Sequence, residues 1–138
     1  MRVRLASTLI SLLCFDTGCV TEHYAALRNT PSATVGVSNC LASIGFSEDS
    51  QLFDMVIGRD PELVAVWSMP SRSRASRAPG TTAWVKAQPG QLRVRLLPGV
   101  GEDNDGTTAL ARSFESCIAE HVPSAEITMT SATTPDLR

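Results

Sequence analysis

Two stretches of the chain place apolar residues at helical spacing. The first has a stripe at positions i, i+3, i+4 and i+7, formed by Val37, Cys40, Leu41 and Ile44. Thr30 and Pro31 mark its start, because a capping side chain precedes a proline in the first turn, and Gly45 marks its end. The second runs from about residue 107 to residue 121, and its stripe is Leu110, Phe114, Cys117 and Ile118. The pattern therefore predicts two amphipathic helices.

The other apolar residues follow strand patterns. Segments rich in strand-forming residues predict strands at 52–58, 63–69, 81–87, 91–97 and 125–131. The turn sequences GRDPE and QPG join the first four of them into two hairpins or a meander. In the second hairpin, alternation assigns the core face to Ala83, Val85, Leu92, Val94 and Leu96. It assigns the opposite face to Trp84, Lys86, Arg93 and Arg95. In the last strand, Ile127 and Met129 are expected to point inward.

The order of these elements predicts an α+β domain. Helix, strands, helix and strand favour a mostly antiparallel sheet of four to five strands with two helices on one face. A chain of 138 residues, 43% apolar and 19% charged, has room for one such domain, which we assign to residues 31–132. Residues 19–30 are expected to form a tether and residues 133–138 a frayed tail. The net charge of −2 gives no electrostatic reason to expect a nucleic-acid partner.

Residues 1–18 have the pattern of a signal peptide. Arg2 and Arg4 precede an apolar run that is too short to span a bilayer, which takes about 20 helical residues. Behind this run, Thr17, Gly18 and Cys19 match the last three positions of a lipobox. In these residues the chain resembles a bacterial lipoprotein precursor.

The resemblance implies a lipid anchor. It implies that the thiol of Cys19 carries diacylglycerol and that the mature, acylated chain begins at this residue. Because Val20 rather than Asp follows the cysteine, it implies attachment to the outer membrane on its periplasmic face. Asp16 departs from the class, which carries Leu, Val or a similar residue there. The alternative is simple secretion or an uncleaved anchor, which would leave the protein secreted or periplasmic.

Lipidation would also decide the pairing of the four cysteines. The lipid would occupy Cys19 and cleavage would remove Cys14, so that Cys40 and Cys117 remain in an oxidising compartment. A Cys40–Cys117 disulfide is the expected state, and two buried free thiols are the alternative. Without lipidation, Cys19 is again a possible disulfide partner.

The outward face of the second hairpin is the sharpest surface feature. In simple register Lys86 faces Arg93 and Trp84 faces Arg95, so like charges lie together beside an indole. Such a surface can bind an anion, such as a lipid phosphate, a cell-wall carboxylate or an acidic strip of a protein. The alternative is a solvated sheet face on which Arg95 lies over Trp84 as a cation–π pair.

The sequence favours a binding protein over an enzyme. The chain has only two histidines, His23 and His121, and no motif of a serine hydrolase, a zinc protease or a phosphate-binding loop. We therefore expect no metal site and no cofactor. The favoured interpretation is a non-enzymatic envelope lipoprotein whose periplasmic domain binds a protein or cell-envelope polymer, as an accessory of an envelope or cell-wall complex. The alternatives are an inhibitor or immunity protein that blocks a periplasmic enzyme and, third, a small cell-wall or lipid hydrolase.

Overall fold

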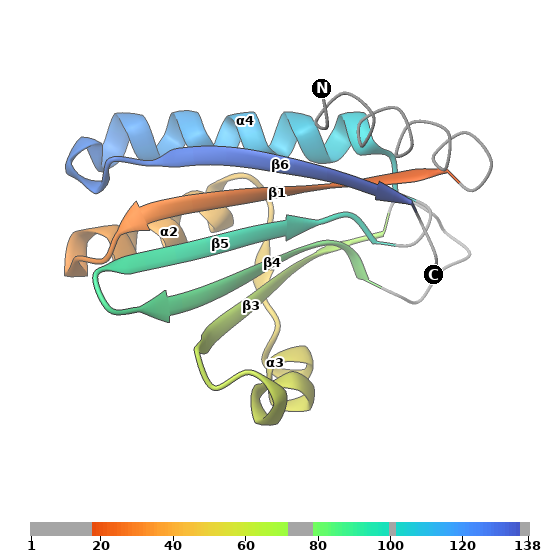
Figure 1. The fold of residues 1–138 in the computed structure, drawn as a ribbon, viewed down its shortest axis with the longest axis horizontal. Helices are drawn as coiled ribbons and strands as arrows, with labels where there is room; N and C mark the ends of the chain where they lie inside the picture. Colours follow the sequence, from red (N-terminus) through yellow and green to blue (C-terminus); the bar gives the residue numbers. More distant parts are fainter. Residues whose placement is uncertain (1–17, 72–78, 100–101, 136–138) are drawn as a thin grey trace, which may run out of the picture.

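The protein is an α+β domain built on one antiparallel sheet. The computed structural model describes residues 18–71, 79–99 and 102–135. Six strands lie in the order β2-β3-β4-β5-β1-β6, and α2 and α4 cover one face (Figure 1). The fold class is therefore confirmed, but the sheet has six strands instead of four to five, and a third helix accompanies the two that were predicted. The strands are β1 (Cys19–Arg28), β2 (Ser47–Glu48), β3 (Leu63–Pro70), β4 (Pro79–Gln88), β5 (Gln91–Leu97) and β6 (Thr128–Pro135).

The helix α2 (Pro31–Ser43) begins and ends as its sequence predicts. The Thr30 side chain accepts a hydrogen bond from the backbone N–H of Ala33 at 3.1 Å, and Pro31 occupies the first turn. Gly45 follows with a φ of +109°, a conformation that favours glycine. α4 (Asn104–His121) begins three residues earlier than predicted, because Asp103 caps it by accepting from the N–H of Gly106.

The core lies between these two helices and the sheet. Every residue that alternation assigned to the core face of β4 and β5 is buried there, which confirms the face assignment of this hairpin. Phe114 and Ile118 of α4 and Leu41 of α2 fill the space above them. Ile127, just before β6, and Met129, within β6, both contact this core as predicted.

Residues 19–28 are a strand and not a tether. β1 lies between β5 and β6 and pairs with both, with Ala25 and Leu27 only 2% exposed. Alanine and charged residues have weak strand propensity, which hid the alternation in this segment. At the other end, residues 133–135 belong to β6 instead of a frayed tail. The predicted signal peptide, apart from Gly18, lies outside the described residues, as do residues 136–138.

The segment predicted as a strand at 52–58 is helical. α3 (Ser50–Val56) continues into a 3-10 turn, η1 (Ile57–Arg59). The Asp49 side chain caps α3 by accepting from the N–H of Leu52 at 2.9 Å. A short apolar run is compatible with either structure, and here the cap decides for the helix. The first predicted hairpin is consequently absent, and β3 pairs with β2 and β4.

The last strand begins later than predicted. Pro123–Ala125 form a second 3-10 turn, η2, and Glu126 follows with a φ of +52°. These residues redirect the chain from α4 into β6. Among the described residues, no helix has the length and apolarity that crossing a bilayer requires.

Candidate functional site

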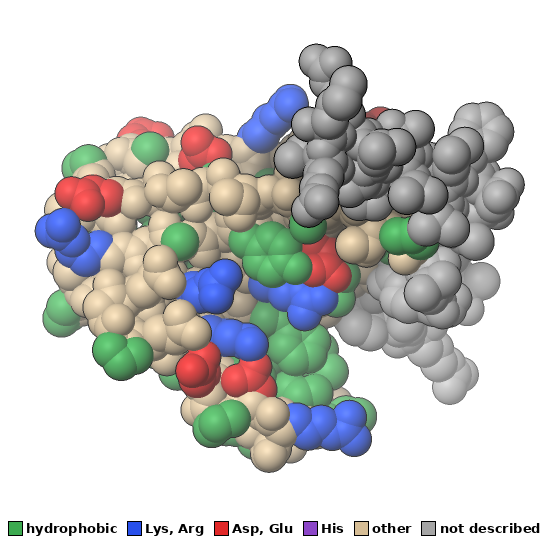
Figure 2. Space-filling model, in the orientation of Figure 1, with side chains coloured by type: hydrophobic (Ala, Val, Ile, Leu, Met, Phe, Trp, Pro, Cys, Tyr) green, Lys and Arg blue, Asp and Glu red, His purple; other side chains and the backbone are tan. Residues whose placement is uncertain are grey.

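The face of the sheet opposite α2 and α4 carries the outward residues of the second hairpin. Lys86 is opposite Arg93 and Trp84 is opposite Arg95, as the sequence predicts. β1 extends both rows, since it places Tyr24 opposite Arg95 and Ala26 opposite Arg93. We call this surface the open-face patch, defined by Glu22, Tyr24, Trp84, Lys86, Arg93 and Arg95. Figure 2 shows Lys and Arg side chains gathered on this face with acidic and hydrophobic side chains beside them.

Glu22 neutralises Arg95. The guanidinium donates from Nε to Oε2 at 3.0 Å and from Nη2 to Oε1 at 2.6 Å, a bidentate geometry. The Tyr24 hydroxyl also donates to Oε2 of Glu22. This hydrogen bond is the main cause that raises the pKa of Tyr24, and the hydrogen bond to Glu22 likewise raises the pKa of Arg95. Tyr24 is thus a neutral hydrogen-bond donor, and the charge of Arg95 is satisfied within the fold.

Asp60 neutralises Lys86. This carboxylate follows η1 and forms an ion pair with the ammonium group of Lys86. The hydrogen bond from Lys86 is the main cause that lowers the pKa of Asp60. The second carboxylate oxygen, Oδ1, accepts from the backbone N–H of Glu62 at 3.3 Å. Two of the three cations in the patch therefore have carboxylate partners from outside the hairpin.

Arg93 is the remaining cation of the patch. It is exposed, and its guanidinium has no hydrogen bond or ion pair with any of the described residues. It borders a shallow groove of about 170 Å³, whose lining is Tyr24, Trp84, Lys86, Gln88, Arg93, Val94 and Arg95. The indole N–H of Trp84 is held by Thr82 Oγ1 at 2.8 Å. The groove thus places the guanidinium of Arg93, which has no partner among the described residues, beside Tyr24 and Trp84.

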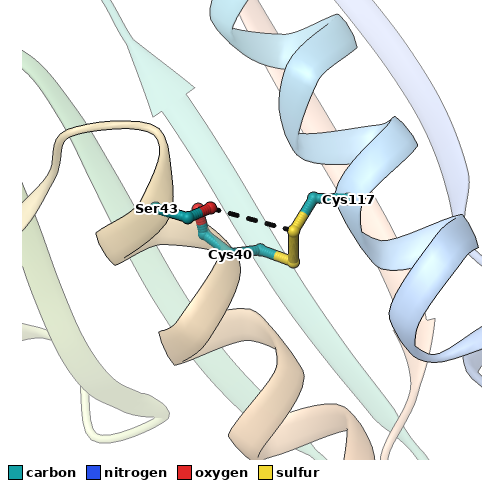
Figure 3. The surroundings of a disulfide bond; sticks show 3 residues. All are labelled: Cys40, Ser43 and Cys117. Atoms are coloured by element: carbon teal, nitrogen blue, oxygen red, sulfur yellow. Dashed lines mark hydrogen bonds between the residues drawn. A yellow bond between two sulfur atoms is a disulfide. The ribbon is translucent and has the colours of Figure 1, made fainter.

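A larger groove lies between the two long helices. Its volume is about 730 Å³, and Val35 and Gly36 of α2 and His121 of α4 are among the residues that line it. The predicted disulfide between Cys40 and Cys117 is present beside it, with a Cα–Cα distance of 5.8 Å (Figure 3). Ser43 Oγ lies 3.9 Å from the sulfur of Cys117. This staple explains why both cysteines occupy apolar helix faces.

The start of β1 is joined to α4. Asn104 Nδ2 donates to the backbone oxygen of Cys19 at 2.7 Å, and Asn104 Oδ1 accepts from the N–H of Thr21 at 3.0 Å. Cys19 itself is disulfide-bonded in this structure. A lipid would need the same thiol, so lipidation and this disulfide are mutually exclusive states of Cys19.

The two histidines are in different environments. His23, expected in a tether, is buried in β1, and its Nε2 lies 3.2 Å from Thr108 Oγ1. Burial lowers its pKa, and the positive charge of Arg112 lowers it further. His121 is exposed at the end of α4. Within the described ranges, no three His, Cys, Asp or Glu side chains are grouped so as to hold a metal ion.

Sequence reasoning missed Tyr24 and the two carboxylates, Glu22 and Asp60, that pair with the cations of the open-face patch. Glu22 and Tyr24 were assigned to a tether, and Asp60 to a turn. The alternation of Glu22 and Tyr24 with the buried His23 and Ala25 is the signal that could have placed them on the open face. Comparisons of the chain with protein-family models, with curated proteins and with solved structures find no match.

Proposed function

We propose that the protein is a non-enzymatic, lipid-anchored protein of the bacterial envelope whose domain binds a macromolecular partner through the open-face patch. The observation that carries the proposal is an exposed sheet face on which Arg93 borders a groove with Tyr24 and Trp84. Trp, Tyr and Arg are the residue types most enriched among those that dominate protein interfaces.

The anchor half of the proposal rests on the lipobox-like sequence that ends at Cys19. Because β1 begins at this residue, lipidation would place the domain against the membrane without a spacer. The intact mass of protein purified from a bacterial membrane fraction tests this. A mass that starts at Cys19 and includes acyl chains supports the anchor, whereas an unlipidated mass with Cys19 in a disulfide refutes it.

The binding half is tested by crosslinking in intact cells. The wild-type full chain is compared with Arg93→Ser and with Arg28→Ser, which removes a cation already paired with Glu126 at 3.2 Å. We expect the crosslinked assembly to be lost in Arg93→Ser and kept in Arg28→Ser. Equal recovery from all three chains would remove the open-face patch from the proposal. Recovery of a single periplasmic enzyme that is silenced by the protein would support the inhibitor alternative.

A further inference from the structure

The charge balance of the open-face patch specifies the ligand more narrowly than its sequence does. The patch and its immediate partners hold three cations and two carboxylates, and both carboxylates are used. Glu22 accepts from Arg95 and from Tyr24, and Asp60 accepts from Lys86 and from a backbone N–H. Among the described residues, neither carboxylate forms a hydrogen bond or ion pair with Arg93. Among the residues that the structure describes, the patch therefore presents one unpaired cation, Arg93, which suits a single anionic group better than a polyanion.

The surroundings of Arg93 suit a planar carboxylate. A guanidinium has five N–H donors in a fork that matches a carboxylate in bidentate geometry. Its cross-strand neighbour on β1 is Ala26, whose small side chain leaves space beside it. The groove of about 170 Å³ has room for one side chain.

We infer that this groove binds an acidic segment of a protein partner, with one Glu or Asp carboxylate on Arg93 and the adjoining chain against Tyr24 and Trp84. The inference rests on the proposed function and specifies the chemistry of its partner. Charge complementarity supplies the carboxylate, and the adjacent tyrosine, tryptophan and arginine favour a protein over a phosphate surface. The Glu22–Arg95 pair acts as a positioning element, because it holds the Tyr24 hydroxyl in place.

The test uses the isotope-labelled full chain and two capped tripeptides, acetyl-Gly-Glu-Gly-amide and its Gln twin. The NMR signal of the Trp84 indole N–H reports on the groove, and that of the buried Trp67 serves as an internal reference. We expect the Glu peptide to shift the Trp84 signal in a saturable manner and the Gln peptide to leave it unchanged. Arg93→Ser should lower the affinity for the Glu peptide by about tenfold or more, and Arg28→Ser should leave it unchanged.

Equal shifts from both peptides, or a Glu-peptide shift that survives in Arg93→Ser, would overturn the inference. A Trp84 shift produced by inorganic phosphate, with none from the Glu peptide, would overturn it in favour of a phosphate ligand. The crosslinking experiment separates this failure from that of the proposed function. If Arg93→Ser still abolishes the assembly while no tripeptide binds, the surface is correct and the carboxylate assignment is wrong.

Discussion

Removal of the Cys40–Cys117 disulfide should cost a large part of the stability of this domain. The two cysteines are 77 residues apart, and closing a loop of that length stabilises the fold by about 4.5 kcal/mol at 25 °C in the chain-entropy model. A domain of this size has about 5–15 kcal/mol in total. We therefore expect Cys40→Ala, Cys117→Ala and the double variant to unfold at much lower urea concentrations than the wild type.

The pattern among the three variants is the sharper test. Each single replacement breaks the same covalent link, so the double variant should lose little more than either single one. Cys40→Ala should cost slightly more than Cys117→Ala, because Cys40 is 1% exposed and its sulfur belongs to the core. The assay is urea unfolding of the full chain followed by tryptophan fluorescence, with the intact mass of each variant checked for rearranged disulfides.

Ser43→Ala is the matched control for this experiment. Its hydroxyl lies beside the sulfur of Cys117 and already donates to the backbone oxygen of Cys40 at 2.9 Å, so its loss leaves the covalent link intact. We expect a change below about 1 kcal/mol. Additive losses in the two cysteine variants would refute the disulfide and mean that each thiol stabilises the core independently.

Two further predictions concern stability. Arg95→Ser should lower the free energy of unfolding, measured in urea, by about 1–3 kcal/mol, because it leaves the largely buried carboxylate of Glu22 without its bidentate partner. Arg93→Ser should change the free energy of unfolding by no more than about 0.5 kcal/mol. Equal losses in the two variants would contradict the pairing. The second concerns His23, whose pKa is lowered in the fold, so the unfolded chain binds more protons just below its ordinary value of 6.5. Stability should fall as the pH drops from 7 to 5, and the fall should be smaller in His23→Gln; an equal fall in His23→Gln and the wild type would contradict this.

Local signals in the sequence predicted the elements that local interactions determine. Thr30, Pro31 and Gly45 act within one turn of α2. Strict alternation of apolar and polar residues predicted β4 and β5 and the register between them. The two elements that were missed have ambiguous local patterns. β1 mixes alanine and a histidine into its buried face, and α3 is an apolar segment whose helical state depends on the Asp49 cap.

The candidate site was predicted in position but not in charge. The facing pairs of the second hairpin follow from its tight turn, and so they could be predicted from the sequence. The partners of its cations come from elsewhere: Glu22 is 73 residues before Arg95, and Asp60 precedes β3. Such pairs can be identified only when the sheet order β3-β4-β5-β1 is known. The sequence therefore overestimated the free positive charge of the open-face patch, of which only Arg93 is left without a partner among the described residues.

β1 connects the proposed anchor with the proposed binding surface. Cys19 is its first residue, and Tyr24 lies five positions further along the same strand. A strand rises about 3.3 Å per residue, so the tyrosine lies about 17 Å from the lipidation site. Arg93 is opposite Ala26, seven positions from Cys19, so with no spacer it would lie about 23 Å from the membrane end of the domain. If the anchor is present, this short distance favours an acidic segment of a partner that is itself at the membrane surface, and so an accessory of a membrane assembly over an inhibitor of a freely diffusing enzyme.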